Sequence, residues 1–304
     1  MNAALRAVVR ASIKRGAEVI GFDHGYEGII NNEGRPLTST SVGGIIDRGG
    51  TILRTARSKR FMTLEGRQLA VENLHANGCE GLVVIGGDGS LTGALKLHEE
   101  FDFPVTGVPG SIDNDIAGTD FSIGFDTAVN TAVEAIDRVR DTAYSHERVF
   151  VIEVMGRRNG FIALEAGIAG GAEAVIIPEE EHNMKLICES LREAFQKGKR
   201  SSIIIVAEGA GKAQEISDDI HAQTGFETRA VVLGHMQRGG SPTQADRVLA
   251  LRLGAMAANR LLSGYRGEMA GVEGTKVVNH AISYVLSTER EIDRERLWLV
   301  SAMS

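Results

Sequence analysis

The chain has 304 residues, 43% of them hydrophobic, which is enough for two cores of ordinary domain size. Its formal net charge of −7 argues against a general nucleic-acid binder, although an acidic protein can still bind anions where a few arginines gather in one cleft. Apolar runs are too short to span a membrane, no secretory signal opens the chain, and Cys79 and Cys188 match neither a metal site nor a disulfide framework, so we expect a cytoplasmic protein.

Short apolar runs alternate with stretches of helical periodicity along the chain. The opening segment predicts a helix, because Leu5, Val8, Val9 and Ile13 recur at helical spacing, and residues 127–140 do the same. The runs that predict strands are 82–85, 149–152, 174–177, 203–206 and 231–233. Because these runs are almost continuously apolar, they are typical of parallel strands covered on both faces, and their alternation with helices predicts a doubly wound α/β fold.

The first candidate site follows the strand at 82–85, where the sequence reads Gly86-Gly87-Asp88-Gly89-Ser90 before a helical stretch. Glycines let a backbone approach phosphate closely, and the start of a helix offers free N–H groups. Asp88 could hold Mg²⁺, which prefers carboxylate and phosphate oxygens. A tight strand-to-helix turn with a capping aspartate explains the same residues equally well.

A second acidic turn, Pro109-Gly110-Ser111-Ile112-Asp113-Asn114-Asp115-Ile116, follows the next apolar run. In an extended segment Asp113 and Asp115 would point the same way, an arrangement that suits one base and one metal-directed carboxylate. An Asn-Asp turn without function is the alternative. Two acidic turns after adjacent predicted strands favour chemistry.

Cationic residues flank two later strands. Arg157 follows the predicted strand 149–154, and His235 and Arg238 follow the strand 229–233, while Arg148 and Arg229 precede these strands. The planar guanidinium of arginine suits phosphate oxygens, although a single arginine at a strand end is usually a surface residue. The chain contains no Walker A sequence.

In order, these segments resemble the 6-phosphofructokinases over almost the whole chain. The resemblance rests on Ile85 to Ser90, Pro109 to Ile116, Glu153-Val154-Met155-Gly156-Arg157, and Leu233-Gly234-His235 through Ser241-Pro242. The Gly-Gly-Asp-Gly turn alone also occurs in NAD and lipid kinases, but the His-Met-Gln-Arg-Gly-Gly segment argues against that alternative. The family implies two Rossmann-like three-layer domains with mainly parallel sheets: residues 1–124 plus 240–288 for the nucleotide, and 125–239 plus 289–304 for the sugar phosphate.

The resemblance also implies roles. Asp113 would be the base for the sugar hydroxyl on carbon 1, Arg157 would face the developing charge, and Ser111, where the family often has threonine, would hydrogen-bond the transferring phosphoryl group. Asp88 and Asp115 would serve Mg²⁺. The implied nucleotide-binding residues, with ATP as co-substrate, are Arg57, Gly87, Asp88, Gly89 and Ser90. The implied substrate-binding residues are Ser111, Asp113, Arg148, Met155, Gly156, Arg157, Glu208, Arg229, His235 and Arg238.

Two of these arginines would reach in from a neighbouring subunit, which implies a homo-oligomer, typically a tetramer. Effector binding is implied by Arg6, Arg10, Arg140, Glu173 and Lys199, although Ser39 and Gly44 stand where bacterial relatives carry a charged arginine and aspartate. We therefore expect any effector preference to be altered.

The phosphoryl donor is expected to be ATP. Diphosphate-using relatives typically have aspartate at the position of Gly89 and lysine at that of Gly110, where the side chains would fill the space of the inner phosphate. A diphosphate-dependent enzyme is the first alternative. The second is a silent or regulatory chain, because the family's first strand and its Gly-Gly-Asp-x-Pro-Gly loop would precede Met1; we expect the true start to lie upstream.

Overall fold

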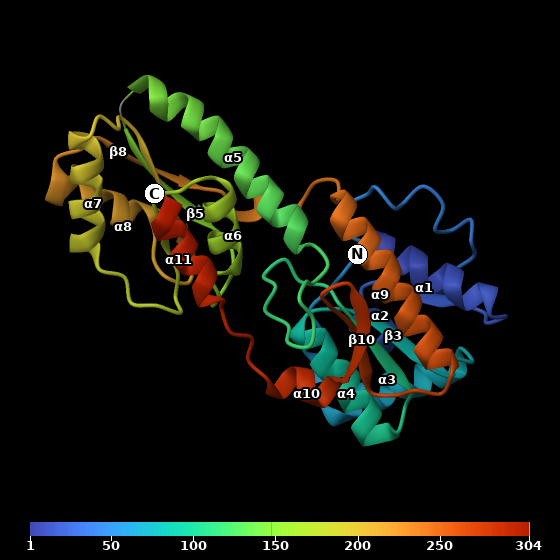
Figure 1. The fold of residues 1–304 in the computed structure, drawn as a ribbon. Helices are drawn as coiled ribbons and strands as arrows, with labels where there is room; N and C mark the ends of the chain where they lie inside the picture. The colour runs from blue at the N-terminus through green and yellow to red at the C-terminus, as the bar shows by residue number, and fades with distance from the viewer. Residues whose placement is uncertain (147, 304) are drawn as a thin grey trace. The chain divides into compact units, whose positions relative to one another are not determined.

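The computed structural model describes residues 1–146 and 148–303 and has the expected α/β fold with mainly parallel sheets (Figure 1). The chain divides into two compact units. The first comprises Met1–Ser111, Ile116–Gly124 and Ser241–Arg290, and the second comprises Ile112–Asp115, Phe125–Gly240 and the residues from Glu291 onward. Residues 112–115 therefore pack with the second unit, a finer division than the expected boundary after residue 124.

The first unit is built on a four-stranded sheet of order β10-β9-β4-β3. Strands β3, β4 and β9 run parallel, and β10 pairs antiparallel with β9. The strands are β3 (Leu82–Gly86), β4 (Val105–Pro109), β9 (Glu268–Glu273) and β10 (Lys276–Ala281). A separate antiparallel pair joins β1 (Ile20–Phe22) to β2 (Gly34–Pro36).

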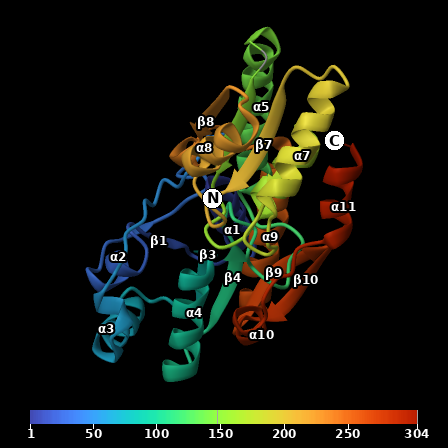
Figure 2. The ribbon, with the colours of Figure 1, turned by 90° about the vertical axis from the view of Figure 1, so that its left-hand side faces the viewer.

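Helices cover both faces of this sheet. Val108 and Ala270 share one apolar cluster with residues of α1 (Asn2–Lys14) and α9 (Gln244–Leu262), which lie side by side in Figure 1. Val105 and Met269 lie an odd number of residues from Val108 and Ala270, so they face the opposite side of the sheet and belong to the other cluster. The helices on that side are α2 (Tyr26–Ile30), α3 (Leu64–Ala76), α4 (Asp88–Phe101) and α10 (Ile282–Ser287), with the short helix η1 (Arg60–Met62). Figure 2 shows α4 running beside β4.

Strand β3 is the edge of this sheet. Among the described residues it pairs only with β4, and its apolar residues 82–85 are half-buried, whereas every residue of β4 is buried. An apolar strand edge with unpaired backbone groups is open to another strand.

The second unit contains a parallel sheet of order β6-β7-β5-β8. Its strands are β5 (Val149–Val154), β6 (Ala174–Ile176), β7 (Ser202–Ala207) and β8 (Thr228–Val232). Its helices are α5 (Phe125–His146), α6 (Phe161–Ala169), α7 (Met184–Gln196), α8 (Ala213–Thr224), α11 (Arg294–Met303) and the short η2 (Gly234–Arg238).

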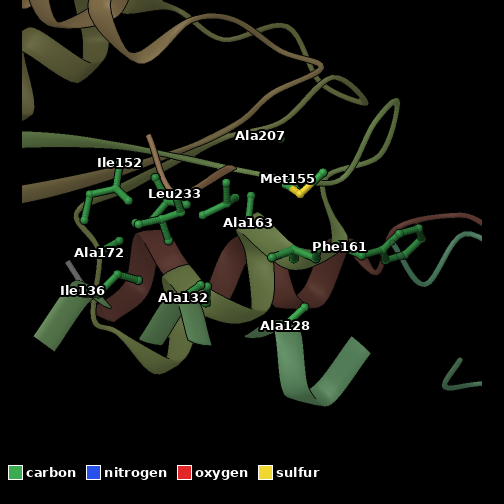
Figure 3. Packing of buried hydrophobic residues seen from close by; sticks show 14 of the residues in the cluster. Ala128, Ala132, Ile136, Ile152, Met155, Phe161, Ala163, Ala172, Ala207 and Leu233 are labelled. Atoms are coloured by element: carbon green, nitrogen blue, oxygen red, sulfur yellow. The ribbon is translucent and has the colours of Figure 1, made fainter. Parts of the chain in front are cut away.

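Successive strand residues face opposite layers of this unit, as the period of two requires. Phe150, Ile152 and Val154 join the cluster formed with α5 and α6, whereas Val149 and Val151 join the cluster formed with α7 and α8. Figure 3 shows the first cluster, with alanines of α5 allowing α6 to pack closely beneath the strands. Burial on both faces explains why these strands are continuously apolar in sequence.

The five predicted strands and both predicted helices are present, with boundaries shifted by a few residues. The antiparallel pairs β1–β2 and β9–β10 were not predicted. β9 contains alanine and glycine among its apolar residues, and β10 is only half-buried, so neither has a continuous apolar run.

Candidate active site

The two acidic turns follow neighbouring strands, as the sequence indicated. β3 and β4 are paired in parallel, and the turns that follow them remain in contact, because the N–H of Gly110 donates to the carbonyl oxygen of Gly86 at 3.0 Å. Ser111 lies beside Gly87: a Cβ added to that glycine would be 3.9 Å from the Ser111 Cβ. The Ser111 hydroxyl and the glycine-rich turn therefore share one end of the first unit's sheet.

The glycine-rich turn opens directly into helix α4. Gly87 is the N-cap residue and Asp88 is the first residue of the helix, so Asp88 is not the capping aspartate of the alternative explanation. Asp88 and Gly89 are exposed. An exposed carboxylate beside the free N–H groups of a helix start suits an anion that carries its own cation, as a magnesium-bound nucleotide does.

The first turn of α4 is held by a tyrosine that the sequence did not single out. The Tyr26 hydroxyl donates to the Ser90 carbonyl oxygen at 2.5 Å, and its ring stacks on Phe61 with centroids 3.9 Å apart. Burial raises the pKa of Tyr26, so the hydroxyl keeps its proton and remains a donor. No local pattern marks this contact, because Tyr26 and Ser90 are far apart in sequence.

Asp113 is a buried carboxylate in the second unit. Its Oδ2 lies 3.3 Å from Arg157 Nε, and its side chain is only 4% exposed. Burial raises the pKa of Asp113 above its usual value, Asp115 raises it further, and Arg157 and Arg238 oppose this by lowering it. A carboxylate with a raised pKa is a stronger base, and the adjacent guanidinium keeps it available in the ionised form.

The extended backbone expected for residues 113–115 is wrong. Asn114, between Asp113 and Asp115, has φ 54°, so the backbone turns there in the left-handed conformation that asparagine tolerates. The two carboxylates nevertheless remain close enough to interact, since Asp115 raises the pKa of Asp113.

The turn after β5 presents Arg157 to Asp113. Arg157 has φ 54°, an uncommon value for a residue other than glycine. Glu208, just beyond β7, accepts hydrogen bonds at Oε1 from the N–H groups of Arg157 (2.9 Å) and Gly156 (3.3 Å). Gly209 permits this close approach, because a Cβ there would lie 2.3 Å from the Arg157 carbonyl oxygen. Glu208, expected from the resemblance to contact the sugar, holds this turn in the structure.

Apart from Ser111, which lies in the first unit, the predicted substrate residues divide between the two ends of the second unit's sheet. One group follows the carboxyl ends of β5, β7 and β8: Met155, Gly156, Arg157, Glu208, His235 and Arg238. Asp113 belongs to this group because it lies beside Arg157. Arg148 and Arg229 lie at the amino ends of β5 and β8, where Glu227 bridges them with Oε1 at 2.9 Å from Arg148 and 2.5 Å from Arg229. Strands of this length span roughly 17–20 Å, which is too far for one sugar phosphate to touch both ends.

The predicted nucleotide residue Arg57 and the predicted effector residues are distributed over both units. Arg57 is exposed in the segment before η1. Of the predicted effector residues, Arg6 donates to the Val42 carbonyl oxygen at 2.7 Å and Arg10 to that of Ser39 at 3.5 Å, both within the first unit. In the second unit, Arg140 donates to the carbonyl oxygens of Gly170 and Gly171, and Lys199 pairs with Glu173 at 2.7 Å.

Within residues 1–146 and 148–303, no three His, Cys, Asp or Glu side chains gather into a metal cluster. Mg²⁺ is usually held by one or two carboxylates together with substrate phosphates, so the roles expected of Asp88 and Asp115 do not require such a cluster. In the same residues, no helix combines the length and apolar character that crossing a bilayer requires.

Comparison with known proteins resolves the family. The family model described as Phosphofructokinase matches residues 1–261. The chain is 54% identical, over all 304 of its residues and 95% of the relative, to the ATP-dependent 6-phosphofructokinases of Shouchella clausii and Bacillus subtilis. This chain belongs to the phosphofructokinase family. The expected resemblance is therefore confirmed, and with it the assignment to kinases.

Solved phosphofructokinases share the fold. A chain of the Saccharomyces cerevisiae enzyme aligns with a TM-score of 0.88 and 34% identity over 94% of this chain, which spans 43% of that yeast chain. The pyrophosphate-dependent phosphofructokinase of Marinobacter aquaeolei aligns with a TM-score of 0.85 at 22% identity, over 98% of this chain and 87% of that one. The latter likeness concerns the fold alone.

Proposed function

We propose that this chain transfers a phosphoryl group from ATP to the carbon-1 hydroxyl of fructose 6-phosphate, yielding fructose 1,6-bisphosphate in glycolysis. Its relatives, 54% identical over the full chain, are named ATP-dependent 6-phosphofructokinases. The single structural observation that carries the proposal is the buried Asp113 carboxylate held 3.3 Å from Arg157 at the end of the second acidic turn. A base beside a cation is what an alcohol acceptor and a developing phosphoryl charge require.

In the proposed mechanism Asp113 accepts the proton of the sugar hydroxyl as the hydroxyl oxygen attacks the γ-phosphorus of ATP. The bond from the γ-phosphorus to the β,γ-bridging oxygen breaks, and ADP leaves. Arg157 neutralises charge that develops on the phosphoryl oxygens, and the Ser111 hydroxyl donates to one of them. The start of α4 binds the donor phosphates through the backbone N–H groups of Gly87 and Gly89 and the hydroxyl of Ser90, whose own N–H donates to the Gly87 carbonyl oxygen at 2.9 Å. Asp88 of the first unit and Asp115 of the second are each proposed as carboxylates for Mg²⁺, which would neutralise charge on the donor phosphates.

The sugar phosphate is proposed to bind between two copies of the chain. His235 and Arg238 of one copy lie at the same sheet end as Arg157, whereas Arg148 and Arg229 lie at the opposite end. A neighbouring copy can supply this second pair, which supports a homo-oligomer with shared active sites; the tetramer is the family's usual state. Arg57 is proposed to contact the nucleotide. The five effector residues are proposed to bind an anionic regulator: Arg6, Arg10, Arg140, Glu173 and Lys199.

We further propose a cytoplasmic setting. Both cysteines, Cys79 and Cys188, are free thiols in the structure, and a reducing compartment preserves them.

The direct test measures product formation from fructose 6-phosphate with either ATP or diphosphate as donor, in the presence of Mg²⁺. Turnover with ATP and none with diphosphate is the expected result. Activity with diphosphate alone would support the first alternative, and no activity with either donor would support the silent-chain alternative.

Substitution of Gly89 by aspartate is expected to lower kcat/KM for ATP by about 100-fold, since a like charge placed against a phosphate costs several kcal/mol. A Cβ at Gly89 meets nothing within 4 Å, so the variant should fold with an unchanged Tm. Steady-state kinetics with the isosteric Gly89→Asn as control separates charge from size. Equal losses in both variants would mean that the added carboxylate charge is not the cause.

A further inference from the structure

A buried glutamine beside the candidate site has no role in the mechanism above. Gln237 is the fourth residue of η2 and is 1% exposed, although its neighbours Met236 and Arg238 are exposed. Its Oε1 accepts the N–H of Met155 at 2.8 Å, a bond buried at both ends. The bond therefore links η2, which carries His235 and Arg238, to the turn that carries Arg157.

The turn that Gln237 holds is the one with unusual backbone geometry. Gly156 has φ 150° and Arg157 has φ 54°, directly after the residue whose N–H Gln237 binds. A non-glycine residue in the left-handed region persists only where its surroundings impose it. Two side chains accept the three successive N–H groups of this turn among the described residues. Gln237 accepts that of Met155, and Glu208 accepts those of Gly156 and Arg157.

The other end of the Gln237 amide argues against a packing role. Nε2 is buried and has no hydrogen-bond partner among the described residues. A buried unsatisfied donor is destabilising, and an apolar side chain of the same shape would avoid that cost. The benefit of glutamine at this position must then come from the acceptor that it offers to Met155.

We infer that Gln237 is a positioning residue for the kinase reaction: through the Met155 N–H it fixes the turn that aims the Arg157 guanidinium at Asp113. The inference rests on the proposed phosphorylation of fructose 6-phosphate. Gln237 does not touch the reacting atoms; it acts through Arg157 and also ties the turn to the helix that carries His235 and Arg238.

Two variants separate the acceptor from the shape of the side chain. Gln237→Met keeps the length and removes the acceptor, and should lower kcat roughly 10- to 100-fold, because small misplacements of catalytic groups have effects of this order. KM for fructose 6-phosphate should rise, while KM for ATP, whose proposed contacts lie in the first unit, stays within about twofold. Gln237→Glu keeps an acceptor and should restore most of the lost kcat. Exposed Gln196 supplies the matched control, Gln196→Met.

A second measurement does not depend on activity. Hydrogen exchange of the peptide covering residues 153–160 should be faster in Gln237→Met than in the wild type and close to wild type in Gln237→Glu. In the Arg157→Ala background, Gln237→Met should produce little further loss of kcat, since residues that act as one unit are non-additive.

The outcomes distinguish this inference from the proposed function. Equal rises in both KM values, an additive loss with Arg157→Ala, or unchanged exchange in Gln237→Met would each overturn the positioning role. If the wild-type chain fails to phosphorylate fructose 6-phosphate, the proposed function fails instead, and the exchange experiment alone decides whether Gln237 holds the turn.

Discussion

Replacing Asp113 by serine is expected to lower kcat by about 10²–10⁴-fold, the usual contribution of a positioned general base. Binding of fructose 6-phosphate should stay largely intact, because the sugar phosphate is held by other residues, among them His235 and Arg238. The variant should also fold, since burial already disfavours the charged form of Asp113 and serine removes that charge. Steady-state kinetics measures kcat, and equilibrium binding measures the affinity for fructose 6-phosphate.

Asp137 provides the matched control for this experiment. It is exposed on α5, so Asp137→Ser changes the same side chain away from the site and should leave kcat unchanged. Near-normal turnover in Asp113→Ser would rule Asp113 out as the base, and a large fall in Tm would show that the loss of rate reflects folding.

Arg157→Ala and Arg229→Ala chains are each expected to be nearly inactive, yet hybrids of the two should recover activity. Arg157 lies at the carboxyl end of β5 and Arg229 near the amino end of β8, so a site shared by two copies takes one residue from each. In a hybrid pair, one site then carries both substitutions and the other carries neither. A random mixture of equal parts should regain about a quarter of the wild-type rate, measured on co-expressed and co-purified chains.

The control hybrid combines Arg157→Ala with Arg238→Ala. Both residues lie at the same end of the same sheet, so every site in this hybrid lacks one of them and no recovery is expected. Recovery in the control as well, or none in either hybrid, would contradict the sharing of sites between copies.

Most of the scaffold was predictable from local patterns. The runs that became β5 and β7 are buried on both faces, so each is continuously apolar and easily recognised. β9 and β10 were not predicted, because neither strand has a continuous apolar run that marks it in the sequence. The extended form expected for residues 113–115 was wrong, because the backbone at Asn114 is left-handed. The surrounding fold sets that conformation, and the two-residue spacing of the carboxylates does not predict it.

The candidate site was predictable in its residue types and only partly in its contacts. The glycine-rich turn and the Asp113 segment could be placed at neighbouring strand ends, and their adjacency is seen in the Gly110–Gly86 hydrogen bond. The positioning contacts of Tyr26, Glu208 and Gln237 could not be predicted. Each joins residues far apart in the chain through a side chain whose direction depends on neighbouring elements.

The sequence by itself determined the alternation of strands and helices, the chemistry of the two acidic turns and, through its motifs, the family. Only the tertiary structure decided that Arg157 faces Asp113, that Arg148 and Arg229 sit together on Glu227 at the opposite sheet end, and that Gln237 supports the Arg157 turn. The physical reason is that periodicity and turn chemistry are local properties of the chain. Which side chains meet depends instead on the strand order, which sets β8 beside β5 although two other strands lie between them in sequence.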